Sequence, residues 1–219
     1  MSGFQRVEDP QAALAWIPAE VREDGDLCGM DATGWEDDTW ILHDLTVPLD
    51  TRDPEQGPRA RCRWRDVVET DLTALQGMAR WPPNAMHLLK DQRWPDVCIE
   101  EGTFDGESRA ALLEILTAVS GPSAQCFAYF GMVPANNYDR PTVLKGALSQ
   151  VASLTSDGLP QWELSPSNWW PVDRSWFVWT DYDLTATRVS GSRNLIDQVR
   201  SHTALETLDW RGPVGGGGS

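Results

Sequence analysis

The strand predicted from Trp176 to Asp183 constrains the fold more than any other segment. Its first four residues, Trp176-Phe-Val-Trp179, are all apolar. Successive side chains of a strand leave opposite faces, so both faces of this strand begin apolar. Burying both faces requires a layer of protein on each side. We therefore expect a central strand in a sheet that is covered on both faces, with Trp176, Phe177 and Trp179 in the core.

Runs of β-branched and apolar residues predict two units with the same order of elements in this half of the chain. They are strands 125–131 and 141–146 with a helix at 147–154, and strands 176–183 and 187–191 with a helix at 192–202. Gly146 and Gly191 occupy matching places, where we expect the chain to turn sharply. This order predicts an α+β fold in which helices pack on one face of a mostly antiparallel sheet, with two β-β-α repeats as its most specific form.

The chain divides into three regions on this basis. Residues 101–212 form the predicted α+β core. Residues 1–100 are richer in Pro and turn residues, and they predict an irregular α/β region packed on that core, with a strand at 39–47. We interpret residues 213–219, which are rich in Gly, as an engineered Gly/Ser linker.

Capping residues mark the starts of two helices. Asp105 is placed to cap an amphipathic helix that runs to Val119, and Gly121 is placed to end it. Asp9, followed by a proline, predicts a second, shorter helix at 10–16.

The residues that lead into the central strand are candidate ligand or partner contacts. We expect Asn168-Trp-Trp-Pro to be part of a loop, so Trp169 and Trp170 are free to form a surface or the rim of a pocket. Indole rings offer a flat stacking surface with a polar edge, and a guanidinium group binds anions. The candidate residues are therefore Trp169, Trp170 and Arg174.

Two acids close the same strand. If the strand continues to its predicted end, Asp181 and Asp183 leave one face together. Such a pair can bind a divalent cation or act as an acid and a base. Aspartate is also common in the turn that follows a strand, and the sequence favours this alternative.

Arginines alternate with other residues directly after Pro58. In an extended segment they would share one face, which can bind carboxylate or phosphate groups of a partner. The sequence favours the alternative, an exposed edge strand whose arginines pair with the protein's own acids and prevent aggregation. A helix that begins here would scatter the stripe. The basic stripe comprises Arg59, Arg61, Arg63 and Arg65.

Acidic residues outnumber basic residues by 33 to 18, and the formal net charge is −15. This balance disfavours nucleic acid as a partner, because binding a polyanion needs a concentrated basic surface. It suits a solvated surface, which is the explanation that the charge alone favours, and it also suits fast association with a basic protein partner. The acids expected to steer such a partner lie in predicted surface loops and are Glu36, Asp37, Asp38, Glu100 and Glu101.

The chain lacks the common catalytic and phosphate-binding motifs. Its four cysteines include no C-x-x-C pair and it has three histidines, so we expect no metal site and no cofactor. A triad of Ser or Cys with His stays open, because its members meet only in space. With neither a visible signal peptide nor a long apolar segment, we expect a cytoplasmic protein with no membrane partner. The sequence leaves the oligomeric state open.

The segment Asn168-Trp-Trp-Pro-Val-Asp-Arg-Ser-Trp176, together with Gly191-Ser-Arg-Asn-Leu-Ile196, resembles a family of uncharacterised actinobacterial proteins. Members of that family share an N-x-W-W-P-x-D-R-x-W segment and a later G-S-x-x-L-I segment. They also share a helix and a C-F-A-like strand, which residues 112–130 match. The resemblance covers residues 100–210. It implies the same order of elements and a bacterial, cytosolic setting, and it supplies no catalytic residues.

Two functions fit these observations. The first is an acidic interaction protein that neutralises or regulates a basic protein, as immunity proteins and antitoxins do. The second is a small-molecule or nucleotide binder, or an enzyme, with its site at the Trp-rich loop, Asp181 and Asp183. The lack of a catalytic motif favours the interaction protein.

Overall fold

The structure is a computed structural model that describes residues 3–22, 30–50, 57–68, 72–77, 81–82, 97–99, 102–131, 142–154, 165–181 and 183–211. The predicted linker at 213–219 lies outside these residues. Within them the chain has the mixed α+β structure expected from the sequence.

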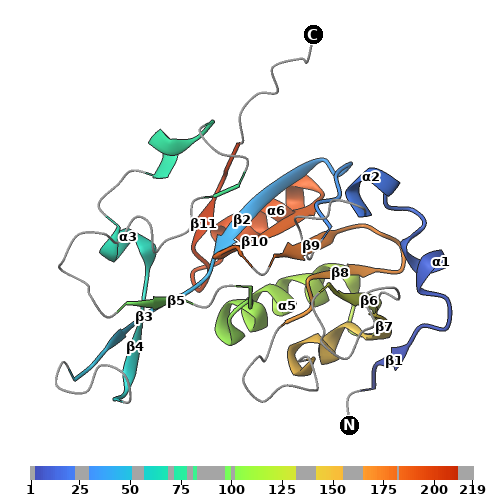
Figure 1. Ribbon diagram of the computed structural model, residues 1–219, viewed down its shortest axis with the longest axis horizontal. Coiled ribbons are helices and arrows are strands. Elements are labelled where there is room, and N and C mark those ends of the chain that lie inside the picture. The colour runs from blue at the N-terminus through green and yellow to red at the C-terminus, as the bar shows by residue number, and fades with distance from the viewer. Residues whose placement is uncertain are drawn as a thin grey trace.

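Eight strands from both halves of the chain form one sheet in which every neighbouring pair is antiparallel (Figure 1). In spatial order they are β1 (Gln5–Arg6), β7 (Thr142–Ala147), β6 (Gln125–Phe130), β8 (Asn168–Pro171), β9 (Phe177–Thr180), β10 (Ala186–Gly191), β2 (Asp37–Leu42) and β11 (Thr207–Leu208). Because β1 and β2 precede residue 100, the sheet spans the predicted boundary between the N-terminal region and the core.

The two long helices and a 3-10 helix pack on one face of this sheet, as predicted. They are α5 (Gly106–Ser120), α6 (Arg193–Ser201) and η2 (Leu148–Ser153). The carboxylate of Asp105 accepts a hydrogen bond from the amide of Ser108, which caps α5, and Gly121 ends the helix with a φ of 89°. Figure 1 shows α5 lying beside α6 across the middle of the molecule.

Shorter elements and aromatic side chains cover the opposite face. The helices that contribute to this layer are α1 (Pro10–Leu14), α2 (Ala19–Arg22), α3 (Trp64–Val67) and η1 (Leu72–Leu75). A second, three-stranded antiparallel sheet lies at one end of the molecule, near the first turn of α5 (Figure 1). In spatial order this small sheet consists of β4 (Arg59–Cys62), β3 (Leu45–Pro48) and β5 (Cys98–Ile99).

The central strand has the two buried faces that its sequence predicts. Trp176 and Val178 belong to the core under the long helices, whereas Phe177 and Trp179 belong to the core on the opposite face. Each of these four side chains is at most 1% exposed. The strand ends at Thr180, earlier than predicted.

The predicted strand at 39–47 is instead two strands in two different sheets. β2 ends at Leu42 and β3 begins at Leu45. Between them the amide of Asp44 donates to the carboxylate of Asp105 at 3.4 Å, and not to a strand partner. This break carries the chain from the large sheet to the small one.

The order strand, strand, helix occurs twice, as β6, β7, η2 and as β9, β10, α6, but a structural repeat is not confirmed. The first helix is a 3-10 helix and the second is an α-helix. Gly146 and Gly191 do not mark sharp turns either, because both lie within strands and neither has a positive φ. Each instead makes room for a close neighbour: a Cβ on Gly146 would lie 2.7 Å from the ring of Phe4, and one on Gly191 would lie 2.7 Å from Leu195.

A Gly146→Ala substitution is expected to lower the free energy of unfolding by about 1–3 kcal/mol, because the added methyl group forces Phe4 away from the sheet. The obstacle includes the Phe4 backbone, which lies 3.0 Å from the place this methyl carbon would occupy, so a rotamer change alone does not relieve it. Gly106→Ala is the control, since a Cβ there meets nothing within 4 Å. Urea unfolding of both variants tests this, and equal stabilities would contradict the packing role of Gly146.

Candidate functional site

Trp169 and Trp170 do not line an exposed loop, so that prediction is wrong. They lie in β8 and each side chain is 1% exposed. Trp169 contacts Trp176 in the core under the helices, and Trp170 stacks on Phe127 on the opposite face. β8 lies between β6 and β9 in the sheet, and its two indole rings are buried on opposite faces. They therefore offer no aromatic surface to a ligand.

Arg174 is the exposed member of the predicted aromatic site. It lies in the turn after β8 with a positive φ of 59°. Its carbonyl oxygen accepts a hydrogen bond from the indole nitrogen of Trp35 at 2.9 Å, and its guanidinium carbon lies 5.1 Å from the ring centroid of Trp16. The side chain therefore stacks on the protein's own indole.

Asp181 and Asp183 do not share a strand face, because β9 ends before them. The Asp181 side chain is fully buried, and its carboxylate accepts a hydrogen bond from the amide of Asp183 at 3.2 Å. The Asp183 side chain is exposed. This geometry is that of an aspartate turn, the alternative that the sequence favours.

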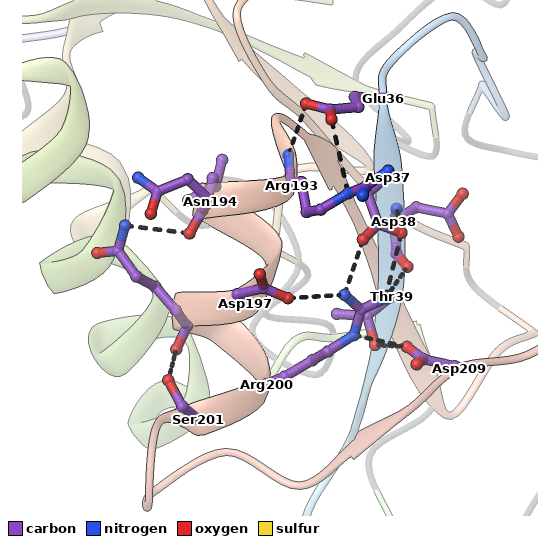
Figure 2. Close-up of polar contacts among 12 residues, drawn as sticks. Glu36, Asp37, Asp38, Thr39, Arg193, Asn194, Asp197, Arg200, Ser201 and Asp209 are labelled. Atoms are coloured by element: carbon purple, nitrogen blue, oxygen red, sulfur yellow. Dashed lines mark hydrogen bonds and ion pairs between the residues drawn. The ribbon is translucent and has the colours of Figure 1, made fainter.

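Asp37, the first residue of β2, points toward α6 (Figure 2). Arg200 of this helix binds the carboxylate of Asp37 at 2.8 Å and that of Asp209 at 3.0 Å. The hydrogen bond to Asp37 favours the charged form of both partners, so the pKa of Asp37 is lowered and the pKa of Arg200 is raised. Asp37 is thus a partner of α6 and not a solvated loop residue.

Two further arginines bind the remaining acids of this group. Arg188 of β10 donates to Asp31 at 2.5 Å and to Asp38 at 2.8 Å. Glu36 accepts from the amide of Arg193 at 3.1 Å, at the first turn of α6 (Figure 2). Glu36, Asp37 and Asp38 therefore hold β2 to α6 and β10, which reduces the charge they can offer to a partner. Glu100 and Glu101 lie outside the described residues.

The basic stripe is divided between a strand and a helix. β4 ends at Cys62, and α3 begins at Trp64. Arg59 donates to the hydroxyl and the carbonyl oxygen of Thr46 on the neighbouring strand. Arg63 donates to the carbonyl oxygen of Thr203 at 2.5 Å, and Arg65 lies 3.9 Å from Glu206. The stripe contacts the protein's own groups, and β4 is an edge strand of the small sheet, as the second interpretation expects.

Arg61 leads to a site that the sequence did not reveal. It forms ion pairs with Asp44 and, at 2.5 Å, with Glu107, and it donates to the hydroxyl of Ser108 at 3.1 Å. Asp105 lies beside this group as the cap of α5 and is 8% exposed. Three carboxylates from two parts of the chain therefore gather around one guanidinium group.

These residues line a hollow of about 510 Å³ between the small sheet and the first turn of α5. The hollow contains the carboxylates of Asp44, Asp105 and Glu107 and the guanidinium groups of Arg59 and Arg61. The other described lining residues are Thr46, Cys98, Ile99 and Gly106. We call this site the Asp44 hollow.

The surroundings of Asp44 in the hollow disfavour the ionised form of its carboxyl group. Burial and the neighbouring charge of Asp105 raise the pKa of Asp44 to about 7, although Arg61 acts in the opposite direction. The Asp44 side chain is 14% exposed. A carboxyl group that titrates near neutrality in a hollow can exchange a proton or bind a cation.

Cys98 is exposed and lines the hollow. Burial raises the pKa of the Cys62 thiol, and it raises the pKa of Cys126 to about 12. These two thiols are therefore poor nucleophiles at neutral pH. In the described part of the chain, no group of three or more His, Cys, Asp or Glu side chains is placed to hold a metal ion.

Sequence reasoning identified Asp105 only as a helix cap and did not identify Asp44 at all. One signal was present: the polar pair His43-Asp44 interrupts the apolar run of a predicted strand. The described helices include none that is long and apolar enough to cross a membrane. Comparison of the chain with protein-family models, with curated proteins and with solved structures finds no match, so the resemblance to the actinobacterial family stays a prediction.

Proposed function

We propose that the protein binds a basic protein and that the Asp44 hollow receives a Lys or Arg side chain of this partner. The observation that carries the proposal is the excess of carboxylate in the hollow. Asp44, Asp105 and Glu107 face two guanidinium groups there, and one of these, that of Arg59, is directed to Thr46. Burial and the neighbouring charge of Asp105 raise the pKa of Asp44, and a cation bound beside both carboxylates would offset the repulsion between them.

The charge of the whole chain favours the same kind of partner. A net charge of −15 attracts cations over a long range and accelerates their association. The four arginines of the basic stripe contact carboxylates or other oxygen atoms of the protein itself. Three further arginines do the same, namely Arg188, Arg193 and Arg200. The partner therefore meets a predominantly acidic surface. Binding would mask a basic surface of the partner, and so neutralise or regulate it.

The size of the hollow fits this occupant. A volume of about 510 Å³ lies within the range of sites that enclose small ligands, and it accommodates an extended Lys or Arg side chain. A guanidinium group can bind two carboxylates with paired hydrogen bonds, whereas an ammonium group offers three donors.

The proposal predicts that a fluorescent octa-arginine peptide binds the purified chain at about pH 8, where Asp44 is ionised. Removing two carboxylates from the hollow with Asp44→Asn and Asp105→Asn is expected to raise the Kd by about tenfold or more. Fluorescence anisotropy measures the affinity. Asparagine at 105 retains the oxygen that caps α5, so the helix keeps its cap.

The control is the double variant Glu8→Gln and Asp173→Asn, which has the same net charge as the hollow variant. Both control residues are exposed, and they follow β1 and β8 of the large sheet, neither of which lines the hollow. We expect this control to change the Kd by less than about twofold at an ionic strength of about 0.15 M, because distant charges are screened. An equal loss of affinity in both double variants would mean that the peptide senses net charge alone, and the proposed site would be wrong.

A further inference from the structure

The small sheet is joined to the large sheet and its helices by a set of polar contacts. Arg61 reaches across to α5 and to the carbonyl oxygen of Ala204. The indole of Trp64 donates to the carbonyl oxygen of His43 at 2.7 Å, and its amide donates to the Glu206 carboxylate at 2.8 Å. We call this boundary the seam. The seam residues that matter here are His43, Asp44, Arg61, Trp64, Asp105 and Glu107.

Asp44 has a special position in the seam because it is the residue at which the chain leaves the large sheet. Its amide donates to the Asp105 carboxylate, and the two carboxyl groups also lie within hydrogen-bonding reach of each other. The charged groups that face Asp44 are Arg61 from β4 and Asp105 from the cap of α5, with Glu107 on the far side of Arg61. The preceding residue, His43, turns its Nε2 atom away to the hydroxyl of Thr187.

We propose that Asp44 and Asp105 share a proton that fastens the small sheet to the first turn of α5, and that loss of this proton loosens the seam. In the fastened form the protonated Asp44 carboxyl group donates to the Asp105 carboxylate. In the ionised form two negative charges lie side by side, with Arg61 as the cation between the small sheet and α5. Opening the seam transfers the Asp44 carboxylate to water and removes this repulsion.

The direction of the pH effect follows from the pKa of Asp44, which is about 7 in the closed protein against an ordinary value of 3.8. The closed seam binds the proton more tightly than the open seam does. The extra stability of the closed seam is fully present below the pKa of Asp44 in the open form. It declines as the pH rises between the two pKa values, and it is lost above the pKa of Asp44 in the closed form. Seam opening is therefore expected to increase up to about pH 7 and then to level off.

This pH dependence concerns the chain alone, although its effect on binding rests on the proposed function. A cation in the Asp44 hollow would compete with the shared proton, so affinity for a basic partner would rise with pH. A failure of octa-arginine to bind would refute the proposed function and leave the shared proton in place. A normal Asp44 pKa would refute the shared proton and leave basic-partner binding possible.

Hydrogen exchange of backbone amides tests the opening. For the wild-type chain we expect protection in β3 and β4 to fall by about tenfold between about pH 5.5 and about pH 7.5, after correction for the intrinsic exchange rate. The amides of β6, in the middle of the large sheet, are expected to keep constant protection. In the Asp44→Asn variant, protection in β3 and β4 is expected to be independent of pH, whereas the Asp173→Asn control should behave as the wild type does.

A ¹³C NMR titration of the Asp44 carboxyl group tests the shared proton in the unmodified chain, and it needs no variant to fold. The expected midpoint is about 7. A midpoint below about 5, or the same pH dependence of β3 and β4 exchange in Asp44→Asn as in the wild type, would overturn the inference.

Discussion

Replacing Trp169 with alanine is expected to lower the free energy of unfolding by about 3–5 kcal/mol, the cost of a large cavity in a core. The side chain is 1% exposed and belongs to the core beneath the long helices. It meets the ring of Trp176 edge-on at 5.7 Å, a contact that adds to the loss of buried area. Urea unfolding followed by Trp fluorescence and far-UV circular dichroism measures the change.

Val172→Ala is the matched control for this substitution. Val172 directly follows β8, and its side chain is 51% exposed, so its truncation is expected to change stability by less than about 0.5 kcal/mol. If Trp169→Ala were as mild as Val172→Ala, the Trp169 ring would not be buried. The sequence-based prediction of an exposed aromatic loop would then regain its basis.

Replacing Arg200 with alanine is expected to lower the free energy of unfolding by about 2 kcal/mol, because three acids lose their cation. The Arg200 side chain is 27% exposed and binds Asp37, Asp197 and Asp209 (Figure 2). Breaking a buried ion pair costs about 3–5 kcal/mol, and partial exposure of the Arg200 side chain reduces that value. The loss leaves Asp37 without the hydrogen bond that lowers its pKa. Denaturant unfolding at about pH 7 measures the effect.

Arg193→Ala removes an equal charge from the same helix and serves as the control. The Arg193 and Glu36 side chains are 69% and 54% exposed and lie 3.5 Å apart. Exposed ion pairs of this kind contribute about 0–1 kcal/mol. Similar losses in the two variants would show that net charge, and not the Arg200 contacts, sets the stability of this part of the fold.

The sequence predicted those elements whose signals are local. Asp105 before an amphipathic run and Gly121 after it mark α5 at almost its observed bounds. The apolar run at Trp176–Trp179 predicts a strand with two buried faces, and the two cores confirm it. Helix caps and the alternation of side chains depend only on near neighbours, so one sequence is enough to find them.

The errors occur where the determining partner is distant in the chain. Asn168 was predicted to lie in a loop, but its side chain accepts from the amide of Met30 at 2.7 Å and donates to its carbonyl oxygen at 2.9 Å. These bonds span 138 residues. They satisfy a buried polar side chain that would otherwise oppose a strand at this place.

The same argument explains why the Asp44 hollow was missed. Its members come from the chain near residues 44, 61 and 105, and the contact between Asp44 and Asp105 spans 61 residues. Each acid alone resembles a loop residue or a helix cap. The burial of Asp44 and its repulsion by Asp105, which together raise the pKa of Asp44, exist only when the small sheet meets α5.

The most direct test of the central claim is to map where a cationic side chain binds. The measurement is a titration of the ¹⁵N- and ¹³C-labelled chain with octa-arginine at about pH 8, followed by the shifts of backbone amides and of aspartate carboxyl groups. We expect the largest shifts at Asp44–Thr46, Arg61 and Asp105–Glu107. Shifts concentrated at Glu36–Asp38 and Asp209–Arg211, with those of Asp44 and Asp105 unchanged, would contradict a binding site at the Asp44 hollow.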